Sequence, residues 1–223
     1  MVIEKAIQNL DTLISQVEFT RLQVSDHLIV QIIAVSKYST SDDIKVLYNA
    51  GQRAFGENKI QDLKVKQEQL KDLPIAWHFI GTLQKNKINN LIDLNPVLFH
   101  SLDSLELASE LDKKLKAKNK TMNCLLQVNS ANESTKSGVS PKDAISIYNV
   151  IKTKYKNINL KGIMSIGANT TDVQEIKNSF ITTKEISSKI DGDICSMGMS
   201  GDFQAAILNG SNMIRVGSAL FKS

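Results

Sequence analysis

The chain has 223 residues, of which 42% are hydrophobic and 22% are charged, and 27 Lys and Arg against 23 Asp and Glu give a net charge of +4. These proportions are typical of globular proteins and exclude disordered and fibrous classes. The charge excess is too small to indicate a nucleic-acid-binding face. The two cysteines, Cys124 and Cys195, lie in apolar runs, which predicts buried, reduced thiols. No apolar run approaches the roughly 18 residues of a membrane span, and the N-terminal segment is unlike a signal peptide, so we expect a cytoplasmic protein without membrane contact.

The N-terminal segment predicts an amphipathic helix, because apolar residues recur at steps of three and four between Val2 and Leu22. Short apolar runs with β-branched or aromatic residues then predict strands. These runs are 31–36, 53–56, 76–80, 97–101, 123–128, 160–166, 193–197 and 213–216. The amphipathic segments between them carry helix start and stop signals. They predict helices over 42–50, 57–70, 83–94, 103–118, 141–155, 172–190 and 202–208.

Strand and helix alternate eight times, which predicts a parallel sheet with helical crossovers. We expect an α/β fold, a (β/α)8 TIM-type barrel with an extra N-terminal helix. An open doubly wound sheet is the alternative, but no strand–helix turn carries the Gly-x-Gly-x-x-Gly fingerprint of such sheets. The chain is predicted to be one domain over 1–223, in which 1–30 form the helix and lead-in and 31–221 form the barrel.

Polar and special residues follow the predicted strands, and in such a barrel the chemistry lies at the carboxyl ends of the strands. The residues at these ends are Lys37, Glu57, Asn58, His78, Gly81, His100, Ser101, Gln127, Asn129, Ser165, the run 196–201, Arg215, Gly217 and Ser218. The strand starts hold ordinary Gln, Asn and Asp residues. This asymmetry predicts one polar pocket at one end of the barrel.

Lys37 follows Ile33 and Val35 at two-residue steps, so the three share one face of their strand. A lysine at the pocket end would be partly desolvated, and its neutral amine could form a Schiff base. The alternative is a lysine that extends its charge into solvent. Arg215 needs an acceptor because its guanidinium keeps its proton, and either a bound anion or a structural ion pair would provide one.

Two turns of small residues, Met199-Ser200-Gly201 and Gly217-Ser218, expose backbone N–H groups and hydroxyls that suit a phosphate. They follow the seventh and eighth strands, where barrels of this type bind phosphate. A lysine, an arginine and a phosphate cradle together indicate pyridoxal 5′-phosphate (PLP). Asn58 and His78 would then be polar neighbours of its ring, although a lone histidine in an apolar run equally suits the core.

Short motifs along the chain occur in the order typical of one family. They are AVSK (34–37), FGEN (55–58), WHFIGTLQKNK (77–87), HSLD (100–103), LLQVN (125–129), KSG (136–138), GIM (162–164), SMGMS (196–200) and RVGSALF (215–221). From about residue 31 to residue 221 the chain resembles the pyridoxal phosphate homeostasis protein family. Its members are single-domain barrels similar to the N-terminal domain of alanine racemase.

The resemblance implies a set of cofactor-binding residues: Lys37, Asn58, His78, Ser101, Met199, Ser200, Arg215, Gly217 and Ser218. Within it, Lys37 carries PLP as a Schiff base and Arg215 faces the pyridine nitrogen, while Ser200, Gly217 and Ser218 hold the phosphate. The resemblance also implies a cofactor carrier in vitamin B6 homeostasis, without robust turnover, which keeps the free aldehyde low and supplies PLP to apo-enzymes.

Three residues depart from the family pattern. Gly201 stands where an acidic residue is expected, Tyr38 where a smaller residue is common, and Lys222 where glycine is usual. A PLP-dependent racemase or lyase of low activity is the alternative function, and a barrel that binds another phosphorylated metabolite, with Lys37 as a charge clamp, is a third. We expect a monomer, because a racemase-like dimer needs a second domain for which the barrel leaves no residues.

Overall fold

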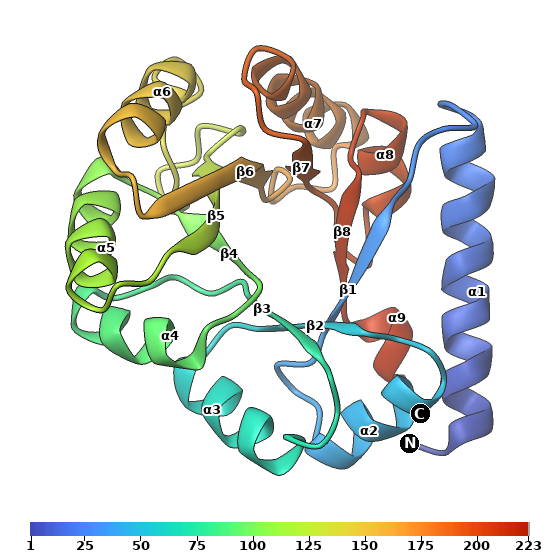
Figure 1. Ribbon diagram of the computed structural model, residues 1–223. Coiled ribbons are helices and arrows are strands. Elements are labelled where there is room, and N and C mark those ends of the chain that lie inside the picture. Colours follow the sequence, from blue (N-terminus) through green and yellow to red (C-terminus); the bar gives the residue numbers. More distant parts are fainter. Residues whose placement is uncertain (223) are drawn as a thin grey trace.

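Within residues 1–222, which the computed structural model describes, eight parallel strands close into a barrel in the order of the sequence (Figure 1). The strands are β1 (Gln31–Val35), β2 (Ala54–Glu57), β3 (Ala76–Phe79), β4 (Leu98–Leu102), β5 (Met122–Val128), β6 (Ile158–Ser165), β7 (Ile194–Ser196) and β8 (Met213–Val216). Closure is made by β1 and β8, which place Ile33 opposite Arg215. The predicted TIM-type fold is confirmed, and the open sheet is excluded.

The helices lie on the outer side of the barrel, one after each strand, with α1 before the first strand (Figure 1). They are α1 (Ile3–Leu22), α2 (Ser41–Asn49), α3 (Ile60–Gln69), α4 (Ile88–Leu94) with the preceding 3-10 turn η1 (Lys85–Lys87), α5 (Leu105–Ala117), α6 (Ala144–Lys154), α7 (Val173–Ser187), α8 (Phe203–Leu208) and α9 (Ser218–Phe221). None of the described helices is long and apolar enough to cross a membrane.

Several predicted helices begin later than expected, and two of these differences are informative. The helix expected over 57–70 begins at Ile60, because Glu57 is still part of β2. The helix expected over 103–118 begins at Leu105 and is capped by Ser104, whose hydroxyl accepts the backbone N–H of Leu107. Because Glu57 remains in β2, this strand keeps a carboxylate at its end, which matters for the turn that carries Lys37.

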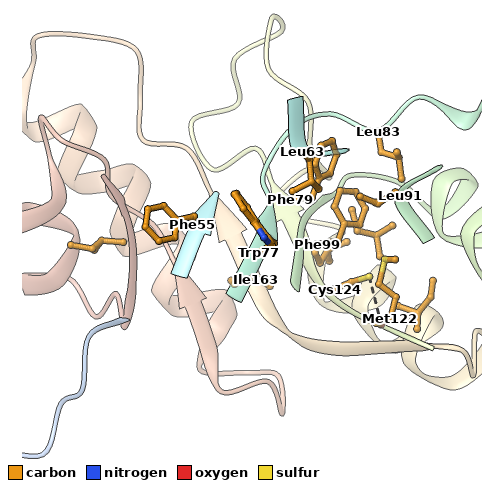
Figure 2. Packing of buried hydrophobic residues seen from close by; sticks show 14 of the residues in the cluster. Phe55, Leu63, Trp77, Phe79, Leu83, Leu91, Phe99, Met122, Cys124 and Ile163 are labelled. Atoms are coloured by element: carbon orange, nitrogen blue, oxygen red, sulfur yellow. Dashed lines mark hydrogen bonds between the residues drawn. The ribbon is translucent and has the colours of Figure 1, made fainter. Parts of the chain in front are cut away.

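Alternation along the strands divides the core into two layers. Ala34 and the outward-facing residues of the other strands pack against the helices, whereas the neighbouring Ile33 points into the barrel. In the outer layer Phe79 of β3 packs beside Phe99 of β4 (Figure 2). Their ring centroids are 5.9 Å apart. The inner layer is made of smaller side chains: Ile33, Ala54, Leu98, Leu125, Met164 and Met213.

The N-terminal helix holds the end of the chain in place beside the barrel. Helix α1 packs on α2, α8 and α9, and Figure 1 shows the two termini close together. The side-chain amide of Asn9 donates to the carbonyls of Leu220 (3.1 Å) and Lys222 (2.9 Å). This contact fixes the segment after β8, which reaches the mouth of the barrel. Both cysteines, Cys124 and Cys195, are free and buried, as predicted for thiols in apolar runs.

Candidate functional site

A cavity of about 950 Å³ opens at the carboxyl ends of the strands. Most of its walls come from β1, β2, β3, β6, β7 and β8 and from the turns that follow them. Seven of the nine predicted site residues line it: Lys37, Asn58, Met199, Ser200, Arg215, Gly217 and Ser218. His78 and Ser101 lie outside the lining. The sequence therefore predicted one polar pocket whose members come from both ends of the chain.

The charge of the cavity suits an anion. Lys37, Arg215 and Lys222 all line it, and none of the described residues in its wall is Asp or Glu. Three cations in a wall whose described residues include no carboxylate create a positive potential that attracts a phosphate or carboxylate ligand. Lys222, the departure from the family's glycine, adds one of these charges.

Lys37 lies in a tight turn just after β1. The backbone N–H of Ser39 donates to the carbonyl of Ser36 (2.9 Å), so Lys37 and Tyr38 form the middle of the turn. The ammonium of Lys37 is 4.8 Å from the centroid of the Tyr38 ring, which is 91% exposed. Lys37 itself is exposed. Of the two alternatives for Lys37, the structure therefore shows the lysine that extends into solvent, because the turn carries the side chain beyond the strand to the cavity rim.

Beneath the cavity, the inner face of the barrel changes from apolar to polar. His78, His100, Ser196 and Arg215 each follow an inward-facing residue of the apolar layer by two positions, and two-residue steps keep them on the inner face. All four are buried. Strands β3, β4, β7 and β8 thus contribute one polar layer that forms the floor of the site.

A directed chain of hydrogen bonds runs through this layer. Arg215 donates from one terminal nitrogen to the hydroxyl of Ser196 (2.6 Å) and from the other to the carbonyl of Ser165 (2.8 Å). Nδ1 of His100 lies 3.5 Å from Oγ of Ser196, and Nε2 of His100 lies 2.9 Å from Nδ1 of His78. Because arginine only donates, Ser196 accepts from it and is free to donate to His100, which then donates to His78.

Burial sets the protonation of these groups. It lowers the pKa of His78 to about 4. Burial, together with the proximity of His78 and Arg215, holds the pKa of His100 well below its ordinary value. Burial also lowers the pKa of Arg215 to about 10, so the guanidinium stays charged at neutral pH. The two histidines are neutral there, as the hydrogen-bond chain requires. No carboxylate forms a salt bridge with Arg215 in the described part of the chain, so the structural ion pair considered for it is not observed.

The two turns expected to hold a phosphate meet each other. The backbone N–H of Gly217 donates to Oγ of Ser200 (3.2 Å). The carboxylate of Asp202 accepts the N–H of Met199 at 2.6 Å, so the acidic residue sits one position later than expected and still closes this turn. A Cβ at Gly201 would meet no atom within 4 Å, so the departure at this position leaves the turn intact.

Ser101 and His78 do not line the cavity but contact residues that form its wall or its floor. The hydroxyl of Ser101 donates to the carbonyl of Ile80 (3.1 Å), and Ile80 lines the cavity together with Gly81. Ser101 thereby holds the segment after β3. His78 ends the hydrogen-bond chain in the floor.

Sequence reasoning named His100 and Ser196 as strand-end residues but not as site residues. The sequence held the signal that His100 faces into the barrel, because His100, like His78, follows an inward-facing residue by two positions. What the sequence did not contain was the pairing across β3 and β4 that brings the two rings together, with centroids 5.1 Å apart.

Comparison with known proteins identifies the family. The family model for the N-terminal domain of alanine racemase matches residues 9–223. A pyridoxal phosphate homeostasis protein of Helicobacter pylori is 51% identical over 216 residues, which cover 96% of this chain and 97% of that protein.

Solved structures share the fold of this chain. PipY of Synechococcus elongatus with PLP bound has a TM-score of 0.82 and 29% identity, and the match covers 97% of this chain and all of that chain (100%). An alanine racemase of Clostridium difficile has a TM-score of 0.74 at 16% identity, covering 97% of this chain and 56% of that one, a likeness of fold alone. The fold, the seven residues that line the cavity and the similarity to known relatives agree. The chain belongs to the pyridoxal phosphate homeostasis protein family.

Proposed function

We propose that this protein binds PLP as a Schiff base on Lys37 and acts as a carrier and buffer of that cofactor in vitamin B6 homeostasis, without robust catalytic turnover. The single observation that carries the proposal is the juxtaposition, in one cavity, of a lysine at the rim, an arginine at the floor and two linked turns of small residues. PipY, a structural relative, has been solved with PLP bound, which supports the choice of ligand.

The residues present fit a ligand with an aldehyde, a ring nitrogen and a phosphate. Ser200, Gly217 and Ser218 would hold the phosphate, and Lys37 and Lys222 supply charge at the same rim. A Cβ at Gly217 would come within 3.1 Å of the carbonyl of Val35, so the absence of a side chain keeps this wall open. Asn58 and Met199 also line the cavity and would lie beside the ring.

Lys37 supplies the covalent link. An amine forms a C=N bond to an aldehyde with loss of water, and it must be uncharged to do so. Lys37 is exposed at the rim of the cavity, where an aldehyde arriving from solvent can reach its amine. A lysine at an open rim suits reversible loading and release better than one sealed in a closed site, and this favours a carrier.

Arg215 disfavours catalysis on the bound cofactor. When bound, PLP withdraws electrons from a substrate carbon best if its ring nitrogen is protonated, as a facing carboxylate would ensure. Arg215 cannot accept that proton, and its charge opposes it. Its hydrogen bonds to Ser196 and Ser165 hold the guanidinium in the floor. The protein therefore binds the cofactor while leaving it a poor electron sink, and the apo-enzymes that receive it are the sites of chemistry.

The test is an absorption spectrum of the purified protein with PLP, followed by borohydride reduction and peptide mass mapping. We expect a yellow band and a pyridoxyl adduct on Lys37. Lys37→Ala should lose the adduct and keep weaker binding through the phosphate and ring contacts. Lys64→Ala, at an exposed lysine of α3, is the matched control and should behave like the wild type.

Two results would count against the proposal. Absence of a band, or an adduct spread equally over Lys37 and Lys64, would remove the site assignment. Racemisation or elimination of amino acids by the pure protein, dependent on Lys37, would remove the carrier role and leave a weak PLP-dependent enzyme instead.

A further inference from the structure

A buried ion pair lies between β2 and α3, outside the cavity wall. Glu57 is fully buried and Lys66 is 8% exposed, and Nζ of Lys66 is 2.7 Å from Oε1 of Glu57. Side chains at this interface are otherwise apolar, with Leu63 of α3 and Phe55 of β2 in the same core layer. Charges in such a place are costly unless they make specific contacts.

Both members of the pair bind Ser36. The Ser36 hydroxyl donates to Oε1 of Glu57 (2.6 Å), and Nζ of Lys66 donates to the Ser36 carbonyl (2.8 Å). The backbone N–H of Ser36 donates to the carbonyl of Gly56 (3.0 Å). Every polar group of Ser36, the residue directly before Lys37, is therefore held by a partner.

The Ser36 carbonyl is also the group that closes the turn carrying Lys37. It accepts the backbone N–H of Ser39 at 2.9 Å as well as Nζ of Lys66. The turn is exposed at its tip, where Lys37 and Tyr38 lie, and is fixed at its base by a fully buried serine. Lys66 thus holds the point from which the side chain of Lys37 projects.

Stability gives no sufficient reason for the pair. Buried ion pairs contribute little over well-packed apolar residues of similar size, and Oε2 of Glu57 has no hydrogen-bond partner in the described structure. An apolar pair would join β2 to α3 equally well. It would leave the Ser36 hydroxyl with only a 3.5 Å contact to the carbonyl of Gly56 and would remove one of the two donors to the Ser36 carbonyl. What the charges add is a fixed geometry at Ser36.

We propose that Glu57 and Lys66 are positioning residues for Lys37: they hold Ser36, and through it the turn that presents the Lys37 amine to the cavity. The inference rests on the proposed function only in the role it gives to Lys37. Replacement of Lys66 should loosen the turn and slow covalent capture of the aldehyde, while the phosphate contacts, which come from the turns after β7 and β8, remain.

The experiment compares Lys66→Met and the double variant Glu57→Gln/Lys66→Met with the wild type. The double variant removes both charges, so it avoids an unpaired buried carboxylate if the single variant fails to fold. Leu63→Ala is the matched control, because it weakens the packing of the same helix without touching Ser36. Three quantities are measured: hydrogen exchange of the Ser39 amide without ligand, the rate of borohydride-fixed adduct formation at Lys37 with PLP, and the affinity for pyridoxine phosphate, which lacks the aldehyde.

In both Lys66 variants we expect exchange of the Ser39 amide to rise and adduct formation to slow, each by roughly tenfold, as for loss of a charged hydrogen bond, with the affinity for pyridoxine phosphate within about twofold of the wild type. Wild-type behaviour of the double variant in the first two measurements would overturn the proposal, as would equal effects in Leu63→Ala. Were the wild type to form no adduct at Lys37, the proposed function would fail, whereas the exchange of the Ser39 amide would still decide whether the pair holds the turn.

Discussion

Replacement of His78 by asparagine should make the protein less sensitive to acid. In the folded protein the pKa of His78 is lowered to about 4 by burial, from an ordinary value of 6.5. Between these two pH values the unfolded chain binds a proton at this site and the folded chain does not. The free energy of unfolding therefore falls as the pH drops below about 6.5, and the loss is complete below about pH 4.

The size of the effect follows from this difference. One pKa unit corresponds to about 1.36 kcal/mol, so His78 alone should remove about 2 kcal/mol of stability between pH 7 and pH 5 and roughly 3 kcal/mol by pH 4. His100, whose pKa is also held well below its ordinary value by burial, acts in the same direction. A loss of this size is a large fraction of the ~5–15 kcal/mol that stabilises a typical domain.

The assay is urea unfolding at pH 7 and pH 5, followed by circular dichroism. In His78→Asn the difference in unfolding free energy between the two pH values should be about 2 kcal/mol smaller than in the wild type. His27→Asn is the matched control, because His27 is exposed and its loss should leave the difference unchanged. Carboxylates that titrate in the same range contribute equally to all three proteins and cancel. An equal acid loss in wild type and His78→Asn would refute the argument that His78 is buried as a neutral imidazole.

Two further predictions concern the floor and the wall of the cavity. Arg215→Glu should raise the proton affinity of the ring nitrogen of bound PLP, because a carboxylate stabilises the pyridinium that the guanidinium opposes; an unchanged absorption spectrum and pH profile would contradict a contact between Arg215 and the ring. Gly81→Ala should cost about 1–3 kcal/mol in unfolding free energy and weaken PLP binding, since its Cβ would lie 2.0 Å from the carbonyl oxygen of Asn58. Gly201→Ala, where a Cβ meets no atom within 4 Å, should leave stability the same or raise it by about 0.4–1 kcal/mol, and equal thermal melting of the two alanine variants would show that crowding at Gly81 is relieved.

Much of the fold could be read from the sequence because its signals are local. Alternating apolar runs and amphipathic segments give the order of strands and helices, and parallel strands with helical crossovers have few possible arrangements. The same local rule, two-residue steps along a strand, places Arg215 on the inner face of β8. Small residues after the last two strands likewise marked the turns that meet through Ser200 and Gly217.

The exposure of Lys37 was not accessible in this way. The two-residue rule holds only while the chain is a strand, and β1 ends at Val35. Beyond that point the turn closed by Ser36 and Ser39 decides the direction of the side chain. The alternative of a partly desolvated lysine depended on extending the strand pattern past the end of the strand.

The sequence by itself determined the order of the elements, the inward face of each strand and the residue types gathered at one end of the barrel. Tertiary structure alone decided which of those residues touch. Strand pairing and closure of β8 on β1 bring His78 and His100 into one hydrogen-bonded floor with Arg215, and the packing of α3 on β2 brings Lys66 to Ser36. The physical reason is that side-chain periodicity depends on neighbours within one segment, whereas contacts across the barrel depend on the register and twist of all the strands together.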